Sequence, residues 1–192
     1  RPLSMMEGTD SSSAAAIFIG YHSATTNTRG VRAHTISSAT FAAVTINGAP
    51  MAESGINALI AGHFGVPVVM ISGDDAAVAE AQQTVPGIEG DVVKRAISFH
   101  SANTLTPAAG QALIREKVRA GMAKRAAIRP VVMRGPLRLD ITFKNYTPAE
   151  VATYLPGVER RDAHTIRYHA ADITHVARFI QFLTSYNSGL TP

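Results

Sequence analysis

The segment from Val66 to Ser72 constrains the fold most, because it is an apolar run of strand length with no polar alternation. Such a strand is typical of a parallel sheet that is covered on both faces. Gly73-Asp74-Asp75 follows and predicts a turn into a helix over residues 76–83. Since parallel strands need crossover connections, we expect strands and helices to alternate along the chain.

The rest of the chain fits this alternation. Residues 14–20 predict a buried strand that ends at Gly20-Tyr21-His22, and Asn47-Gly48 predicts a tight hairpin after a strand over residues 40–46. Ala52 to Phe64 predicts a helix in which Gly55 and Gly62 indicate close packing. Further expected elements are a strand over 92–99, a helix over 106–124, a strand over 137–144, a short helix opened by the capping box Thr147–Glu150, an edge strand over 165–169 and a last helix capped by Asp172.

These elements predict the α/β class, with a three-layer, mostly parallel sheet and a smaller C-terminal α+β appendage. We expect residues 1–130 to form the α/β core and residues 131–192 to form the appendage packed on it.

The amino-acid composition limits which side chains could bind a metal ion and where the protein is expected to reside. The chain has no Cys, so a metal site would have to use His, Asp or Glu side chains. This composition fits a reducing compartment, and we expect a cytoplasmic location. No apolar run approaches the ~18 residues of a membrane helix, so no membrane partner is expected. Because the chain opens with Arg1 rather than Met, we expect that a segment precedes it.

The charge is uneven along the chain. Residues 1–93 hold three Lys or Arg against eight Asp or Glu, whereas residues 94–192 hold fifteen against six. A basic half invites a nucleic-acid interpretation. However, the basic residues are scattered over several elements and aromatic residues make up only 6%, which leaves little for base stacking. A solvated surface is the preferred interpretation, and no nucleic-acid partner is expected.

Three residues are candidates for a functional site, although each has an ordinary explanation. His22 follows a buried strand at the sheet edge where α/β proteins bind ligands, yet a hydrogen-bonded loop His would look the same. Glu53 opens a helix, where the helix dipole alone favours a carboxylate. His34 follows a polar loop over residues 23–30 and taken alone would be structural.

Other polar residues are weaker candidates. Asp74 and Asp75 lie at a strand-to-helix turn, where helix capping explains them. His164, His169 and His175 are spaced loosely over a presumed strand and helix, so a metal site there is the less favoured interpretation.

The order of motifs is more specific than any single residue. The chain presents, in order, Phe18-Ile19-Gly20-Tyr21-His22, His34-Thr35, Ile46-Asn47-Gly48, Glu53-Ser54-Gly55-Ile56-Asn57-Ala58, Ala61-Gly62, Val66-Pro67-Val68 through Gly73-Asp74-Asp75, Val93-Lys94 and Leu105-Thr106-Pro107. This order resembles the zinc-dependent D-aminopeptidase family, often encoded beside dipeptide transporters. The opening Ser4 to Gly8 also fits the segment before the Gly-Tyr-His strand, so the resemblance covers essentially the whole chain.

The resemblance implies a role for each candidate. His22 and Glu53 match two zinc ligands of the family, and His34 matches its active-site His outside the metal shell. The family pattern also implies two zinc ions per protomer, which can share a hydroxide that attacks the peptide carbonyl. Its remaining ligands, an Asp-x-Glu and a further His, belong to motifs that would lie upstream of Arg1.

Two functions therefore stay open. The first is a cytoplasmic aminopeptidase that hydrolyses N-terminal D-amino acids, of the D-Ala type, from short peptides and amides. The second is a truncated, non-catalytic fragment that keeps the fold and the oligomer without the full dinuclear site. The resemblance implies a homo-oligomer of stacked rings, decamer-like, under both interpretations.

Overall fold

The computed structural model describes the backbone of residues 1–190 and the side chains of residues 1–186. Its first sheet contains β1 (Ala16–Tyr21), β4 (Val68–Asp74) and β5 (Glu89–Ser98) in parallel, with β6 (Ser101–Thr104) antiparallel at the edge. All seven residues of the central strand β4 are buried, as its uninterrupted apolar run predicts. The polar strand β6 was not expected from the sequence.

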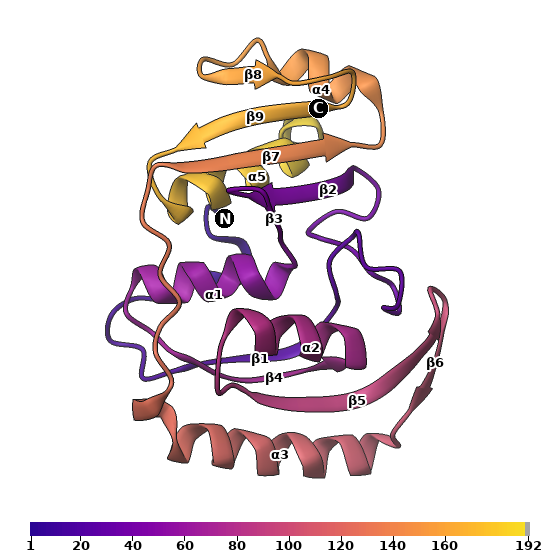
Figure 1. Cartoon of the computed structure of the whole chain (residues 1–192), viewed down its shortest axis with the longest axis vertical. Coiled ribbons are helices and arrows are strands. Elements are labelled where there is room, and N and C mark those ends of the chain that lie inside the picture. The colour runs from indigo at the N-terminus through magenta and orange to yellow at the C-terminus, as the bar shows by residue number, and fades with distance from the viewer. Residues whose placement is uncertain (191–192) are drawn as a thin grey trace.

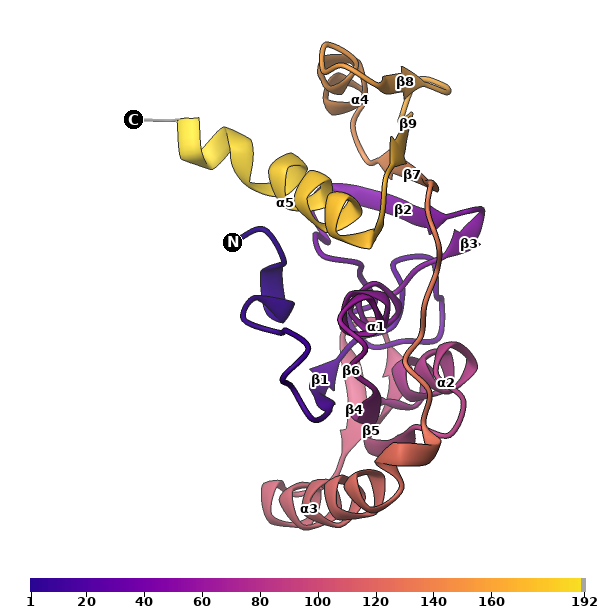
Figure 2. The same ribbon diagram turned by 90° about the vertical axis from the view of Figure 1, so that its left-hand side faces the viewer.

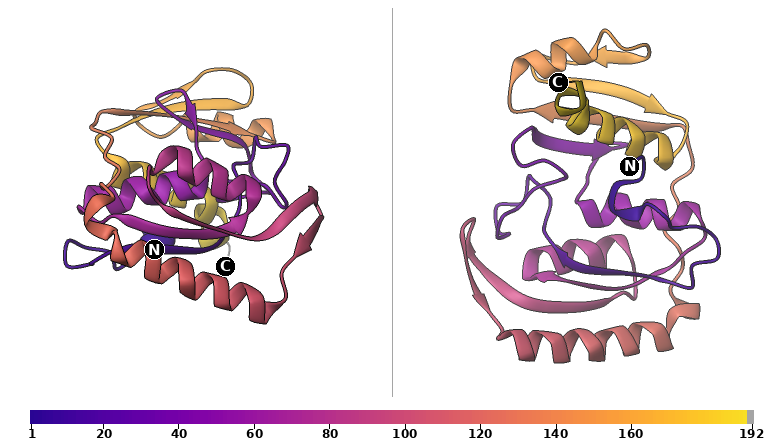
Figure 3. Two further views of the ribbon diagram at one scale, coloured as in Figure 1. Left: turned by 60° about the horizontal axis from the view of Figure 1, so that its bottom comes forward. Right: turned by 180° about the vertical axis from the view of Figure 1, so that it is seen from behind.

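Helices cover both faces of this sheet (Figure 1). The helices α1 (Glu53–His63) and α2 (Asp75–Thr84) lie on one face, and α3 (Pro107–Ala123) crosses the other (Figure 3). This arrangement confirms the α/β class and its three layers. The strand β4 and helix α3 approach closely, since a Cβ at Gly121 would lie 2.5 Å from the Val69 carbonyl oxygen.

The second sheet is antiparallel and has the order β3-β2-β7-β9-β8. Its strands are β2 (Phe41–Ile46), β3 (Ala49–Pro50), β7 (Leu137–Phe143), β8 (Val158–Arg160) and β9 (Thr165–Ala170). Alternate residues of β7 are buried, which matches the predicted alternation. The prediction that residues 165–169 form an edge strand is wrong, because β8 pairs with β9 on its open side.

The hairpin between β2 and β3 confirms the prediction for Asn47-Gly48. Asn47 has φ of 53° and Gly48 has φ of 87°, the left-handed conformations that a two-residue hairpin turn requires. The Asn47 side chain also accepts a hydrogen bond from the backbone N–H of Arg138 at 2.9 Å. The turn is therefore tied to β7 as well as to its own strands.

Two helices accompany the second sheet. In α5 (Ile173–Leu190), the predicted apolar stripe is buried and packs between α1 and the strands β7 and β9 (Figure 2). The backbone N–H of Thr174 donates to Asp172 at 2.8 Å, so the predicted cap is confirmed. The capping box at Thr147 is wrong: α4 (Tyr146–Ala152) begins after Asn145, without a side-chain cap, so Thr147 lies inside the helix and Glu150 pairs with Arg160 instead.

Short 3-10 helices at Ser4–Met6 and Arg125–Ala127 complete the described elements. The division into residues 1–130 and 131–192 stays a proposal. The second sheet combines β2 and β3 from the first segment with three strands from the second, and one apolar cluster spans both segments. Within residues 1–190, no helix combines the length and the apolar character that crossing a membrane requires.

Candidate metal and catalytic site

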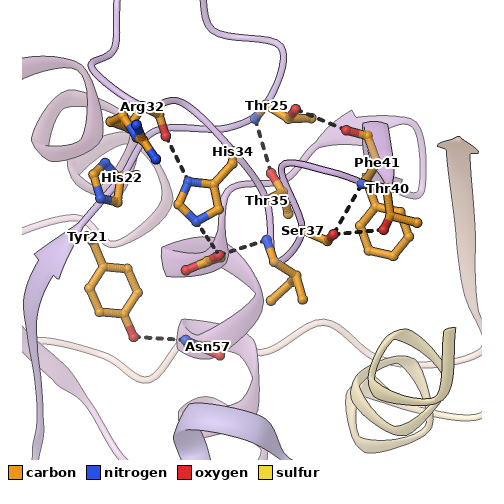
Figure 4. Close-up of polar contacts among 12 residues, drawn as sticks. Tyr21, His22, Thr25, Arg32, His34, Thr35, Ser37, Thr40, Phe41 and Asn57 are labelled. Carbon is orange, nitrogen blue, oxygen red and sulfur yellow. Dashed lines mark hydrogen bonds and ion pairs between the residues drawn. The ribbon is translucent and has the colours of Figure 1, made fainter. Parts of the chain in front are cut away.

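Three chain segments meet beyond the carboxyl end of β1. His22 follows this strand directly, His34 comes from the connection between β1 and β2, and Glu53 is the first residue of α1. The rings of His22 and His34 lie 5.1 Å apart between centroids (Figure 4). The Nε2 atom of His34 lies 3.3 Å from Oε1 of Glu53. The structure therefore brings the three predicted site residues together around His34.

The orientation of His22 is fixed by a backbone carbonyl. Its Nδ1 lies 2.9 Å from the oxygen of Val31, and only an N–H can satisfy that acceptor. A neutral imidazole carries one N–H, so this contact assigns the proton to Nδ1 and leaves a lone pair on Nε2. A metal-binding His is commonly held in this way, with its other nitrogen donating to a carbonyl or carboxylate.

The ring of His34 faces oxygen atoms on both sides. Its Nδ1 lies 2.7 Å from the carbonyl oxygen of Arg32, and its Nε2 faces Glu53 (Figure 4). A neutral imidazole can donate to only one of them, so the pair of His34 and Glu53 offers a place for one further proton. This arrangement is suited to receiving and returning a proton.

The loop that carries His34 has an unusual backbone. Arg32 has φ of 54° and Ile36 has φ of 63°, a conformation that is a genuine outlier for a β-branched residue. The N–H of Ile36 donates to Oε1 of Glu53 at 2.7 Å. Such conformations cost about 1–3 kcal/mol each and cluster at functional sites. Nothing in the sequence signalled them, because neither residue is Gly or Asn.

The loop before His34 is firmly anchored. The N–H of Ala24 and the amide of Asn27 donate to the carboxylate of Glu80 at 2.8 and 2.6 Å. Fully buried Thr35 donates to the Met51 carbonyl at 2.8 Å and accepts from the N–H of Thr25 at 3.2 Å. The polar composition of residues 23–30 reflects these internal contacts.

Tyr21 and Asn57 lie beneath the site and were not singled out from the sequence. The side-chain amide of Asn57 donates to the Tyr21 hydroxyl at 2.8 Å (Figure 4). Burial, together with the nearby charge of Glu53, raises the pKa of Tyr21 to about 12. The hydroxyl is therefore neutral at physiological pH. Spacing could have found Asn57, since it lies four residues after Glu53 on the same helix face.

The weaker candidates make other contacts. Asp74 caps α2 through Ala77 and also accepts the N–H of Val31, whereas Asp75 accepts the N–H of Ala96. His175 bonds its neighbour Asp172 at 3.1 Å, and His169 lies exposed on β9. Among the described side chains, no group of three or more His, Asp or Glu residues is placed to hold one metal ion.

The donor set at the site nevertheless suits zinc. Imidazole nitrogen and carboxylate oxygen are ordinary zinc ligands, and the free Nε2 lone pair of His22 meets the requirement that a ligating His be unprotonated there. His22 and Glu53 thus fit as part of a metal shell. That both reach one ion stays a prediction.

An α/β fold with imidazole and carboxylate groups gathered beyond a strand end suits a metallopeptidase. The sequence model of the family Peptidase_M55, described as D-aminopeptidase, matches residues 1–182, and the chain belongs to this family. It is 34% identical over 185 residues to the D-aminopeptidase of Bacillus subtilis (strain 168), covering 96% of this chain and 67% of that protein.

A solved structure agrees with this assignment. It is described as the Zn-dependent D-aminopeptidase DppA from Bacillus subtilis, a self-compartmentalizing protease. The TM-score is 0.90 at 32% sequence identity, over 96% of this chain and 67% of that one. The predicted family is thereby confirmed, and at family level the chain is a metallo-aminopeptidase.

Proposed function

We propose that this protein is a zinc-dependent aminopeptidase that removes N-terminal D-amino acids, of the D-Ala type, from short peptides and amides. The observation that carries the proposal is the meeting of His22, His34 and Glu53 beyond β1, with Nε2 of His34 lying 3.3 Å from Glu53. The membership of a D-aminopeptidase family supports the reaction class.

His22 and Glu53 would hold the metal, His22 through Nε2 and Glu53 through its carboxylate. Bound zinc polarises a carbonyl and makes a water molecule acidic, which is the chemistry that peptide hydrolysis needs. We propose that the Asp-x-Glu and the further His implied by the family resemblance complete the metal shell, with two zinc ions per protomer.

His34 would move the proton. The Arg32 carbonyl engages Nδ1 of its ring, so Nε2 is the atom that would accept and donate the proton. With Glu53 at 3.3 Å as a partner for the same proton, Nε2 can take a proton from the attacking water and return it to the leaving amine. General acid–base help of this kind is worth about 10²–10⁴ in rate.

A second candidate is a non-catalytic chain that keeps the fold and the assembly. It is favoured by the finding that no three potential ligands among the described side chains are placed to hold an ion. One measurement distinguishes the two proposals. An intact mass and N-terminal sequence of the purified natural protein would reveal an upstream Asp-x-Glu, which the enzyme needs and the fragment lacks.

Self-assembly is also proposed, since the related B. subtilis protein is described as self-compartmentalizing. An exposed apolar groove between α4 and α5 supports contacts between copies, with Tyr154 75% and Phe182 42% exposed. Light scattering on the purified protein would test this, and a strictly monomeric mass would contradict it. The cytoplasm stays the predicted location.

The proposed activity is tested by zinc per protomer and by hydrolysis of a D-alanyl amide, with the L-alanyl amide as the matched control. We expect zinc to copurify, hydrolysis of the D-form to exceed that of the L-form, and both zinc and activity to be lost in His22→Ala. Hydrolysis that survives complete removal of zinc would refute the proposal.

A further inference from the structure

Asp74 divides its carboxylate between a helix and the loop of the candidate site. It is the last residue of β4 and is fully buried. Its Oδ1 accepts the N–H of Ala77 at 2.7 Å, which caps α2. Its Oδ2 accepts the N–H of Val31 at 2.9 Å. Since a cap needs only one oxygen, the second contact calls for a separate explanation.

The second contact leads to His22. Val31 is buried, and its carbonyl oxygen receives the Nδ1 proton of His22 at 2.9 Å. His22 and Val31 are nine residues apart in the chain, so their distance depends on the contacts that anchor the loop between them. Asp74 makes the contact at Val31 itself, holding it against the end of β4, next to the strand from which His22 emerges, while the N–H of neighbouring Arg32 donates to the Phe99 carbonyl at 2.8 Å.

We propose that Asp74 is a positioning residue for His22, acting through the backbone of Val31. The proposal rests on the proposed function, in which Nε2 of His22 binds metal. When Asp74 holds Val31 in place, the Val31 carbonyl keeps the His22 proton on Nδ1 and the lone pair on Nε2. Without that anchor the Val31 carbonyl is held less firmly, so the ring gains freedom to rotate and to change tautomer.

The chemistry of Asp74 matches this double task. A carboxylate has two acceptor oxygens and can satisfy two N–H groups, and hydrogen bonds to an ionised acceptor are the strong ones. Asn has the same shape but only one acceptor, so its amide nitrogen would face an N–H. Ser can cap α2 through its single oxygen but has no second oxygen for Val31.

These differences allow capping and positioning to be separated. Asp74→Ser keeps a cap on α2 and removes the Val31 contact. Asp74→Asn keeps the shape and loses one of the two contacts. Asp172→Ser is the matched control, because Asp172 caps α5 through the N–H groups of Thr174 and His175 and has no link to His22.

The first measurement is the tautomer of His22 in the metal-free protein, read from ¹⁵N chemical shifts of the ring and assigned with His22→Gln. We expect one Nδ1–H tautomer in the wild type and in Asp172→Ser, and a mixture in Asp74→Ser. The second measurement is the zinc dissociation constant by chelator competition. It should rise about tenfold in Asp74→Ser, the lower end of the 10–100-fold range for groups that orient a ligand.

An unchanged His22 tautomer in folded Asp74→Ser would overturn the inference, as would a changed tautomer with unchanged zinc affinity. If Asp74→Ser does not fold, Asp74→Thr, which also has a single oxygen for the cap of α2 and none for Val31, decides by the same criteria. A wild-type protein that binds no zinc would contradict the proposed function, whereas the tautomer of the metal-free protein would still confirm or reject the role of Asp74. The two proposals can therefore fail separately.

Discussion

Two glycines on the same helix should respond in opposite ways to the same substitution. Gly55 and Gly62 both lie in α1, and replacing a helical Gly with Ala gains up to about 1 kcal/mol of helix propensity. At Gly55 the added Cβ would lie 3.2 Å from the Met51 sulfur, the end of a flexible side chain that can yield. We expect Gly55→Ala to be stabilising.

At Gly62 the added Cβ would lie 1.8 Å from the carbonyl oxygen of Val131 and 2.6 Å from its carbonyl carbon. These are backbone atoms of the connection into β7, so that segment must move. Overpacking of this kind costs about 1–3 kcal/mol, and the severity of the overlap places it at the upper end. After the gain in propensity, Gly62→Ala should lose about 2 kcal/mol.

Thermal unfolding followed by circular dichroism measures the difference. For a chain of this size, 1 kcal/mol corresponds to about 2–4 °C in Tm. We expect Gly55→Ala to raise Tm by about 2–4 °C and Gly62→Ala to lower it by about 4–8 °C. A Gly62→Ala protein as stable as Gly55→Ala would refute the reasoning, since it would mean that the connection at Val131 is not packed on α1.

Three further predictions concern single side chains. His34→Ala should lower kcat on a D-alanyl amide by a factor of about 10²–10⁴ while the zinc content per protomer stays near normal. A near-normal kcat would show that His34 has no catalytic role. Loss of zinc from the variant would show that His34 is a metal ligand. Asp91 is buried and neither carboxylate oxygen has a hydrogen-bond partner among the described residues, and burial raises its pKa. Ionisation of the buried Asp91 carboxyl should therefore lower the stability of the wild type as pH rises above about 4, whereas Asp91→Asn lacks this loss. At pH 7, urea unfolding should find the variant about 1–3 kcal/mol more stable than the wild type. Equal stability of the two proteins at pH 7 would contradict this prediction. Burial alone would raise the pKa of Asp172, but hydrogen bonds from Thr174 and His175 hold it well below its usual range. Asp172→Ala should cost about 1 kcal/mol near pH 7, and the cost should shrink as pH falls below about 4; a cost that persists unchanged at pH 2 would exclude the carboxylate as its source.

Several local signals in the sequence predicted their elements correctly, although the capping box at Thr147, which is also local, did not. The apolar run of β4, the Asn47-Gly48 turn and the Asp172 cap each depend on a few adjacent residues, and all three are confirmed. The strand β6 was missed because Ser101 to Thr104 has no apolar alternation and forms by pairing with β5. The prediction for β9 was wrong because its outer neighbour β8, which lies just before it in the chain, has only three residues, too few to show a strand pattern.

The candidate site could be predicted as residues but not as an arrangement. The motif order singled out His22, His34 and Glu53, while the contacts that orient them come from groups with no sequence signal of their own. The carbonyl oxygens of Val31 and Arg32 hold the two imidazoles. Backbone atoms are the same in every residue, so only the folded loop reveals which of them face the site.

The contacts of the strained loop are compatible with both roles that we propose for Glu53. The N–H of Ile36 and Nε2 of His34 both contact Oε1 of Glu53, so neither contact engages Oε2. A carboxylate held at one oxygen can present the other to a metal ion, and hydrogen bonds to a ligating carboxylate fix its orientation. Ile36, whose φ is 63°, is the residue that donates its N–H to Oε1, so the strained conformation lies directly beside the candidate site. On this reasoning Oε1 belongs to the proton that Glu53 shares with His34, and Oε2 is the oxygen left for zinc.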